Sequence, residues 1–502
     1  MKYLVIDYLE QTTRLFGEKI GVIDENSRIT YNTLQKSAKS IASWLIHNDT
    51  VFESIPIYAV KSTLTTCALW GAIYAGCHYT FLDVKQPKER LKKILAKLEP
   101  AIMLTDKTHY EEARNIFTDI KIICIDNIVG YKCCEETLLQ IRDKICCTTP
   151  LYVNFTSGTT GEPKGVVVSH LSVVDFIDVF VECFHITHNE VLGNQAPFDF
   201  DVSVKDIYSC AATGATLVII PRDYFCKPKE LMDYLIEEKV TTLIWAVSAM
   251  CFVTTMKAFL YKVPERIKKV MFSGEIMPIK HLEMWRRVYP EAMFVNLYGP
   301  TEITCNCTYH ILEDKETYEQ GIPIGKPFKN ENVFLLNDKQ QLISDSGQEG
   351  EICVTGITLA LGYYKDEKTT KAHFIKNPLN KRFIELMYMT GDLAKYGEDG
   401  LLYYVGRKDM QIKHMGHRIE LQEIEFFVNK LNSINRACCV FCKDRKKIIL
   451  FYIGESNSIE INKYLTDKLP FYMIPNIYVK VESMPLTKNG KVDRNKLLVE
   501  YM

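Results

Sequence analysis

Residues 152–170 read YVNFTSGTTGEPKGVVVSH, and the rest of the chain can be placed around them. A strand-like run is followed by a loop of Thr, Ser, Gly, Pro and Lys, and then by a second strand-like run at residues 166–168. Glycines let a backbone approach a ligand closely, hydroxyls can donate to phosphate oxygens, and a lysine adds a mobile positive charge. The stretch therefore predicts a phosphate-binding loop between two strands, formed by Thr156, Ser157, Gly158, Thr159, Thr160, Gly161 and Lys164.

Two other interpretations fit this loop less well. The Walker pattern needs Gly-Lys-[Ser/Thr] at the start of a helix, whereas Lys164 is followed by Gly165 and then by valines. A flexible surface turn would account for the glycines, but a turn rarely places so many hydroxyls beside a lysine.

The segment TSGTTGEPKG, residues 156–165, resembles the phosphate loop of the adenylate-forming enzymes. This superfamily includes acyl- and aryl-CoA synthetases, luciferases and amino-acid adenylation domains. The resemblance implies ATP and Mg²⁺ as cofactors and does not by itself choose among the members.

The composition is that of an ordinary globular protein. The 502 residues are too many for one hydrophobic core, and 47% apolar and 25% charged residues are typical values. A net charge of −1 gives no reason to expect nucleic acid or an anionic membrane as a partner.

The N-terminus lacks the features of a signal peptide, and the apolar window at 67–84 is too short and too polar for a membrane span. Seventeen scattered cysteines do not form a disulfide framework, so we expect a reducing, cytoplasmic location.

The hydrophobic pattern predicts an α/β protein. Strand-like and helix-like segments alternate from Pro56 to about residue 130 and again after the phosphate loop, which predicts parallel sheets covered by helices. From about residue 320 to Val405, short alternating strands separated by Gly, Asp and Asn predict a mainly antiparallel, β-barrel-like region. We expect a large N-terminal adenylation core at 1–406 and a small, mobile α+β domain at 407–502.

Further blocks resemble the adenylate-forming enzymes, in the order that the family requires. In Asn296-Leu-Tyr-Gly-Pro-Thr-Glu302 the resemblance implies that Tyr298 faces adenine, Thr301 contacts the α-phosphate and Glu302 binds Mg²⁺. In Tyr388-Met-Thr-Gly-Asp392 the resemblance implies that the aspartate accepts from the ribose hydroxyls. Asn296, Gly299 and Arg407 are further expected nucleotide contacts, and Asp409 is the expected hinge residue. Lys491, in Pro485-Leu-Thr-Lys-Asn-Gly-Lys-Val-Asp493, is the expected mobile catalytic lysine.

These parts imply a reaction in two steps. A carboxylate attacks the α-phosphorus of ATP, and pyrophosphate leaves while Lys164, Glu302 with its Mg²⁺, and Lys491 offset the developing charge. A thiol then attacks the acyl-adenylate. Lys491 is expected to act in the first step and to leave the site for the second.

The identity of the acid depends on the block Asn194-Gln-Ala-Pro-Phe-Asp-Phe-Asp-Val-Ser-Val204. Asp201 matches the aspartate with which amino-acid adenylation domains pair the substrate ammonium, although Asp199 is an alternative register. A buried carboxylate is costly unless a cation neutralises it, so Asp201 predicts an amino acid substrate. The residues that align with the substrate pocket of amino-acid adenylation domains are Asp201, Val202, Lys205, Ala249, Met271, Ser273, Leu297, Cys305, Asn306 and Lys491.

Over essentially its whole length the chain resembles the D-alanine:carrier-protein ligases. That family places a cysteine where this chain has Ser273, and an apolar residue where it has Lys205. Lys205 could pair a substrate carboxylate, as in some glutamate-activating domains, or extend away from the pocket.

No carrier-like segment follows Lys491, so we expect a stand-alone monomer that charges a separate phosphopantetheinylated carrier protein. An acid:CoA ligase is the main alternative from another reaction class. A non-catalytic nucleotide-binding protein is a third, which the intact Lys164, Glu302, Asp392 and Lys491 disfavour.

Overall fold

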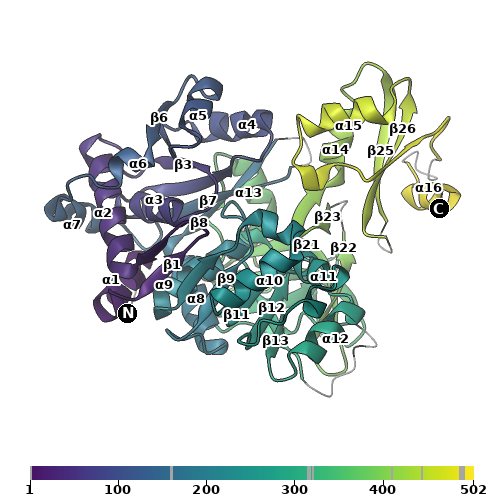
Figure 1. The fold of residues 1–502 in the computed structure, drawn as a ribbon. Helices are drawn as coiled ribbons and strands as arrows, with labels where there is room; N and C mark the ends of the chain where they lie inside the picture. The colour runs from purple at the N-terminus through teal and green to yellow at the C-terminus, as the bar shows by residue number, and fades with distance from the viewer. Residues whose placement is uncertain are drawn as a thin grey trace. The chain divides into compact units, whose positions relative to one another are not determined.

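In the computed structural model the chain divides into two compact units, described separately below (Figure 1). The structure describes residues 3–158, 162–313, 318, 321–408, 411–442, 445–485 and 492–501. The first unit comprises Met1–Val84, Leu98–Asn154 and Gly165–Lys408. The second unit comprises Lys85–Lys97, Phe155–Lys164 and Asp409–Met502.

A nine-stranded sheet runs through the first unit in the order β15-β14-β13-β12-β11-β9-β10-β1-β2. Its central strands are parallel and almost wholly buried, as expected for Val- and Ile-rich runs covered on both faces. The strands are β1 Ile20–Ile23, β2 Arg28–Thr30, β9 Val191–Asn194, β10 Thr216–Ile219, β11 Thr242–Ala246, β12 Lys269–Ser273, β13 Met293–Tyr298, β14 Thr308–Ile311 and β15 Lys326–Pro327.

A second, seven-stranded sheet has the order β19-β8-β7-β4-β3-β5-β6. Its strands β3, β4, β5, β6 and β7 are linked by parallel pairings, and β19 pairs antiparallel with β8. Both β7 and β8 flank the phosphate loop. The strands are β3 Ser54–Ala59, β4 His78–Asp83, β5 Ile102–Thr105, β6 Lys121–Cys124, β7 Pro150–Thr156, β8 Lys164–Ser169 and β19 Gly362–Tyr363.

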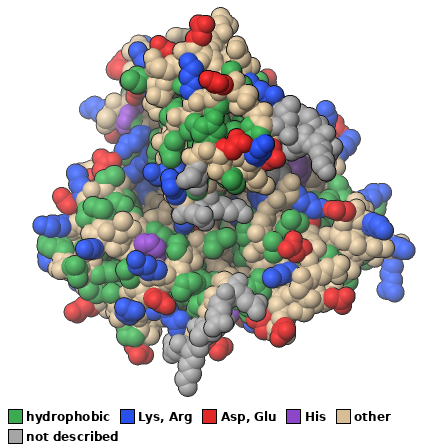
Figure 2. Space-filling model, turned by 90° about the vertical axis from the view of Figure 1, so that its right-hand side faces the viewer, with side chains coloured by type: hydrophobic (Ala, Val, Ile, Leu, Met, Phe, Trp, Pro, Cys, Tyr) green, Lys and Arg blue, Asp and Glu red, His purple; other side chains and the backbone are tan. Residues whose placement is uncertain are grey.

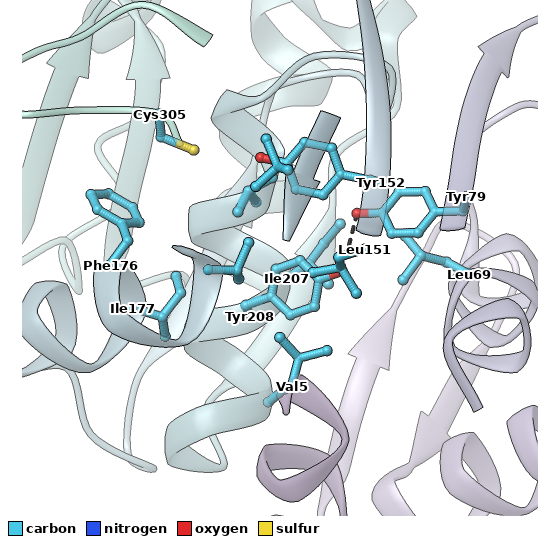
Figure 3. Packing of buried hydrophobic residues seen from close by; sticks show 14 of the residues in the cluster. Val5, Leu69, Tyr79, Leu151, Tyr152, Phe176, Ile177, Ile207, Tyr208 and Cys305 are labelled. Atoms are coloured by element: carbon cyan, nitrogen blue, oxygen red, sulfur yellow. Dashed lines mark hydrogen bonds between the residues drawn. The ribbon is translucent and has the colours of Figure 1, made fainter. Parts of the chain in front are cut away.

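The five longest helices of the first unit, among others, share one hydrophobic core with both parallel sheets. Figure 3 shows part of it, where Tyr79, Tyr152 and Tyr208 meet and the hydroxyls of Tyr79 and Tyr208 lie 3.1 Å apart. Burial of so many apolar side chains in one cluster holds the sheets and helices together. These helices are α1 Val5–Phe16, α2 Tyr31–His47, α3 Thr63–Tyr74, α8 His170–Cys183 and α9 Val202–Thr213. The remaining helices of the first unit are α5 Tyr110–Ile116, α6 Ile125–Ile128, α7 Glu135–Arg142, α10 Pro228–Glu237, α11 Val247–Thr255, α12 Ile279–Val288 and α13 Glu367–His373.

An antiparallel sheet completes the first unit. Its strands run in the order β17-β16-β18-β21-β20, and β22 also pairs with β21. The strands are β16 Glu331–Leu336, β17 Leu342–Ile343, β18 Glu349–Gly356, β20 Phe374–Lys376, β21 Leu386–Tyr396 and β22 Leu402–Arg407.

The second unit is α+β. A β23–β24 hairpin precedes a three-stranded sheet in the order β25-β26-β27, and β25 packs against α14 and α16. Its elements are α4 Lys88–Leu98, β23 Gln411–His414, β24 His417–Glu420, α14 Leu421–Val428, β25 Ile434–Cys442, β26 Lys447–Gly454, α15 Ser458–Thr466, β27 Ile477–Lys480 and α16 Arg494–Tyr501.

The fold class predicted from the sequence is therefore confirmed: parallel α/β sheets, an antiparallel β region and a small α+β part. In the described part of the chain no helix is both long and apolar enough to cross a membrane. The window at 67–84 is instead helix α3 followed by strand β4. Figure 2 shows acidic and basic side chains interspersed over the face in view, as expected for a net charge of −1.

Candidate active site

The described part of the phosphate loop belongs to the second unit. At Gly158 a Cβ atom would lie 2.2 Å from the carbonyl oxygen of Glu162, so the loop can fold back on itself only with glycine there. Ser157 Oγ donates to the carbonyl of Arg418 at 2.8 Å, and Thr156 Oγ1 to that of Lys164 at 3.5 Å. Thr159, Thr160 and Gly161 lie outside the described residues.

A buried ion pair supports this loop and was missed by the sequence analysis. Arg90 and Glu423 are 4% and 1% exposed, and Arg90 Nη1 lies 3.2 Å from Glu423 Oε1. The backbone N–H of Gly158 is close enough to the Glu423 carboxylate to lower its pKa. Burial nevertheless raises the pKa of Glu423, with Arg90 opposing that effect. No motif points to this contact, because 333 residues separate the two partners.

The nucleotide motif in the first unit lies at the end of β13. Gly299 turns the chain against the next segment, where a Cβ atom would lie 2.4 Å from Asn306 Cα. The short turn Thr301–Ile303 follows, and Thr301 and Glu302 are both buried. Tyr363, on β19, donates to Glu302 Oε1 at 2.7 Å. Asn296 Nδ2 donates to the carbonyl of Pro323 at 2.8 Å and is thus part of the local framework.

Four side chains meet at the predicted ribose motif, and three of them were singled out from the sequence. Asp392 is fully buried, and its carboxylate accepts from Arg407 Nη1 at 2.7 Å and from Tyr298 Oη at 2.6 Å. Tyr404, which the sequence analysis did not single out, lies at 3.5 Å from Asp392 Oδ1. Burial and the Asp392 charge raise the pKa of Tyr298 far above its ordinary value, so Tyr298 keeps its proton and donates.

Three of the residues predicted to line the substrate pocket, Asp201, Val202 and Lys205, lie at the N-terminal end of α9. Asp201 is the N-cap residue of the helix and is 6% exposed, although its side chain does not cap the helix. Cys305 Sγ donates to the Asp201 carbonyl at 2.9 Å. Val202, Ser273 and Leu297 are also buried.

Lys205 is completely buried, so it does not extend to the surface. Its ammonium donates to Asn306 Oδ1 at 2.6 Å, and burial lowers its pKa while the charge of Asp201 partly offsets that effect. Asp201 and Lys205 are four residues apart at the start of α9, which places them on one helix face a turn apart. The carboxylate of Asp201 and the ammonium of Lys205 thus belong to the same face of the helix.

A family comparison identifies this arrangement. The sequence model described as "AMP-binding enzyme" matches residues 9–364. The chain belongs to the AMP-binding enzyme family. Among curated relatives, tyrocidine synthase 1 of Brevibacillus parabrevis is 29% identical over 503 residues, which cover 97% of this chain and 44% of that protein. Tyrocidine synthase 3 of the same organism is 32% identical, over 97% of this chain and 7% of that protein. The chain therefore spans less than half the length of these relatives.

Solved structures show the same fold. An adenylation domain of Vibrio cholerae, AlmE, in complex with glycyl-adenosine-5′-phosphate has a TM-score of 0.86 at 19% identity, covering 100% of this chain and 98% of that one. Holo-PA1221, a protein containing adenylation and PCP domains, has a TM-score of 0.85 at 23% identity, covering 99% of this chain and 84% of that one.

AMP-binding enzymes of this kind use ATP with Mg²⁺, and the residues present fit that metal. Mg²⁺ is commonly held by one or two carboxylates together with substrate phosphates and water, so it needs no dedicated cage. Glu302 supplies a buried carboxylate of the hard oxygen type that Mg²⁺ prefers, held in place by Tyr363. Within the described ranges no cluster of three or more His, Cys, Asp or Glu side chains that could hold a metal ion is present.

Two residues expected in this enzyme's cycle lie outside the described residues. These are Asp409, the expected hinge, and Lys491, the expected mobile catalytic lysine. Their roles remain predictions from the sequence motifs.

Proposed function

We propose that this AMP-binding enzyme activates an amino acid as its aminoacyl-adenylate and transfers it to the phosphopantetheine thiol of a separate carrier protein. In the first step a carboxylate oxygen of the amino acid bonds to the α-phosphorus of ATP, and the bond to pyrophosphate breaks. In the second step the thiol sulfur bonds to the carbonyl carbon, the thiol proton is lost and AMP leaves. The observation that carries the proposal is the buried Asp201 carboxylate at the start of α9.

The proposed roles of the side chains follow from their chemistry. Asp201 pairs the α-ammonium, because a buried carboxylate needs a cation nearby. Asp392 and Arg407 hold the ribose, with Tyr298 beside them as a hydroxyl donor and flat surface. Glu302 would hold Mg²⁺, which would supply positive charge to offset that of the departing pyrophosphate. Lys164 contacts the phosphates.

The C-terminal portion completes the proposed cycle. We assign residues 1–406 to an adenylation core and 407–502 to a mobile domain that turns about Asp409. Lys491 enters the site for adenylation and leaves before the thiol arrives.

The first experiment is amino-acid-dependent exchange of labelled pyrophosphate into ATP, with a panel of D- and L-amino acids and simple carboxylic acids. Exchange with an amino acid and its loss in Asp201→Asn support the proposal. Exchange only with acids that lack an amino group refutes it. Thioester formation is then compared with free CoA and with a phosphopantetheinylated carrier protein, because preference for CoA would indicate an acid:CoA ligase instead.

The side chain of the substrate is proposed to be acidic. Lys205 has three N–H donors, and among the described residues its hydrogen-bond acceptor is Asn306 Oδ1. A buried ammonium is costly without further partners. An aspartate- or glutamate-like substrate would place its α-ammonium at Asp201 and its side-chain carboxylate at Lys205, one helical turn further along the same face.

D-alanine is the competing substrate of the same reaction, and it would leave Lys205 paired with Asn306 alone. Replacement of Lys205 by Met distinguishes an acidic amino acid from D-alanine as the substrate. For an acidic amino acid we expect kcat/KM to fall about 100- to 1000-fold, the scale for leaving one member of a buried charge pair unpaired. Lys269→Met, which removes a lysine paired with Glu190, is the matched control. Dominant exchange with D-alanine, unchanged in Lys205→Met, would contradict the acidic assignment.

A further inference from the structure

Lys61 holds the start of the loop that carries Asp201. It lies between β3 and α3, and its Nζ atom is within hydrogen-bond distance of four oxygens. These are Asn194 Oδ1 at 2.8 Å and the backbone carbonyls of Gln195 at 3.0 Å, Asn194 at 3.1 Å and Ala196 at 3.2 Å. One ammonium thus fixes three consecutive peptide units.

These carbonyls depend on Lys61. Strand β9 ends at Asn194 in the middle of the nine-stranded sheet, and the chain then crosses to α9. In the described part of the chain no other group donates to the carbonyls of Gln195 and Ala196. Without Lys61 the carbonyls of Gln195 and Ala196 would lose the one donor that the described structure gives them. Because an unpaired buried carbonyl is costly, the loop would then rearrange.

The same ammonium also fixes the far side of the loop. Asn194, which is completely buried, accepts from Lys61 through Oδ1 and donates through Nδ2 to Asp206 Oδ2 at 2.7 Å. Asp206 lies in the second turn of α9, five residues after Asp201, and its other carboxylate oxygen has no hydrogen-bond partner in the described structure. Asn194 is therefore the single hydrogen-bonded link between Asp206 and Lys61.

We infer that Lys61 is a positioning residue for amino-acid recognition, which sets the place of Asp201 by holding both ends of the segment 194–206. The inference rests on the proposed function, in which Asp201 pairs the substrate ammonium. Lys61 itself touches neither substrate nor nucleotide in this scheme. Its removal should weaken amino-acid binding and leave ATP binding almost unchanged.

The test uses the full-length enzyme with Lys61→Met, Lys61→Arg and a control, Lys19→Met. Lys19 also donates to backbone carbonyls, those of His188 and Gly214, the second of which ends α9 at its opposite end. In pyrophosphate exchange, Lys61→Met should raise the KM for the amino acid at least tenfold and change the KM for ATP less than twofold. Lys61→Arg should recover part of the loss, because a guanidinium can still donate to several carbonyls. Lys19→Met should leave the amino-acid KM within twofold.

Amide hydrogen exchange measures the positioning without using activity. Lys61→Met should speed exchange in the segment 195–206 at least tenfold, whereas Lys19→Met should not. Equal increases of both KM values, or unchanged exchange in 195–206, would overturn the inference. If the wild type shows no amino-acid-dependent activity, the proposed function fails, and the hydrogen-exchange comparison still decides whether Lys61 holds this loop.

Discussion

Replacing Tyr363 by Phe tests whether the buried hydroxyl next to Glu302 is part of the reaction machinery. The hydroxyl donates to Glu302 Oε1 at 2.7 Å, and Glu302 is 2% exposed. A hydrogen bond to a charged group contributes about 1.5–3 kcal/mol, and the substitution removes it while keeping the ring. If that contribution orients Glu302 in the transition state, the rate falls about 10- to 100-fold, since about 1.4 kcal/mol corresponds to a factor of ten.

The assay is pyrophosphate exchange with saturating amino acid, with ATP and Mg²⁺ varied. We expect kcat to fall within that range and the amino-acid KM to stay within twofold, because Tyr363 does not belong to the amino-acid pocket. Tyr289→Phe is the matched control, since it also removes a buried hydroxyl, one that has no hydrogen-bond partner in the described structure. If Tyr363→Phe and Tyr289→Phe have the same activity, Tyr363 does not position Glu302 and the reasoning is refuted.

Three further predictions concern the nucleotide site and stability. Lys491→Ala should cost the adenylation step about 3–4 kcal/mol, the scale of a lost electrostatic contact, and the thiol step much less; equal losses in single-turnover measurements of the two steps would contradict its assignment. Asp392→Ala should lower the free energy of unfolding by about 3–5 kcal/mol in urea titrations, because Arg407, only 6% exposed along its side chain, loses the carboxylate of its buried ion pair. Burial lowers the pKa of His170 to about 3, below its ordinary value of 6.5. Between these two pH values the imidazole is protonated in the unfolded chain and neutral in the native state. Stability is therefore lost as the pH falls through 6.5 towards 3; between pH 7.5 and 5.5 the loss is about 1.4 kcal/mol, and it should be absent in His170→Gln.

The sequence predicted those parts of the molecule that depend on local pattern. The hydrophobic pattern predicts strands at Thr242–Ala246 and Lys269–Ser273 and an amphipathic helix at Tyr31–His47. Strands β11 and β12 and helix α2 have these same bounds. Periodicity and turn residues carry this information, because both are set by neighbours within a few positions. The motif residues Asp392, Arg407 and Tyr298 are also brought together in the structure.

What the sequence could not supply is the set of partners that hold the motif residues in place. Tyr363 and Glu302 are 61 residues apart, and Lys61 and Asn194 are 133 residues apart. No local pattern links such pairs, since only the packing of separate sheets brings them together. The direction of Lys205 was left open for the same reason, because burial of a side chain is decided by distant elements such as the segment that carries Asn306.

Asp392 and Glu302, two buried acids of the first unit, are each held by neighbouring donor groups, which suits their proposed roles in ligand binding. A carboxylate has about four acceptor positions, and in Asp392 the bonds from Arg407, Tyr298 and Tyr404 occupy three of them. A ribose hydroxyl can therefore add to Asp392 without breaking the ion pair that keeps its charge compensated. Glu302, the carboxylate proposed to hold Mg²⁺, likewise accepts a hydrogen bond from Tyr363 at Oε1. Side chains fixed in advance in this way need little reorganisation when the nucleotide arrives, and low reorganisation is what makes preorganised electrostatic groups effective in catalysis.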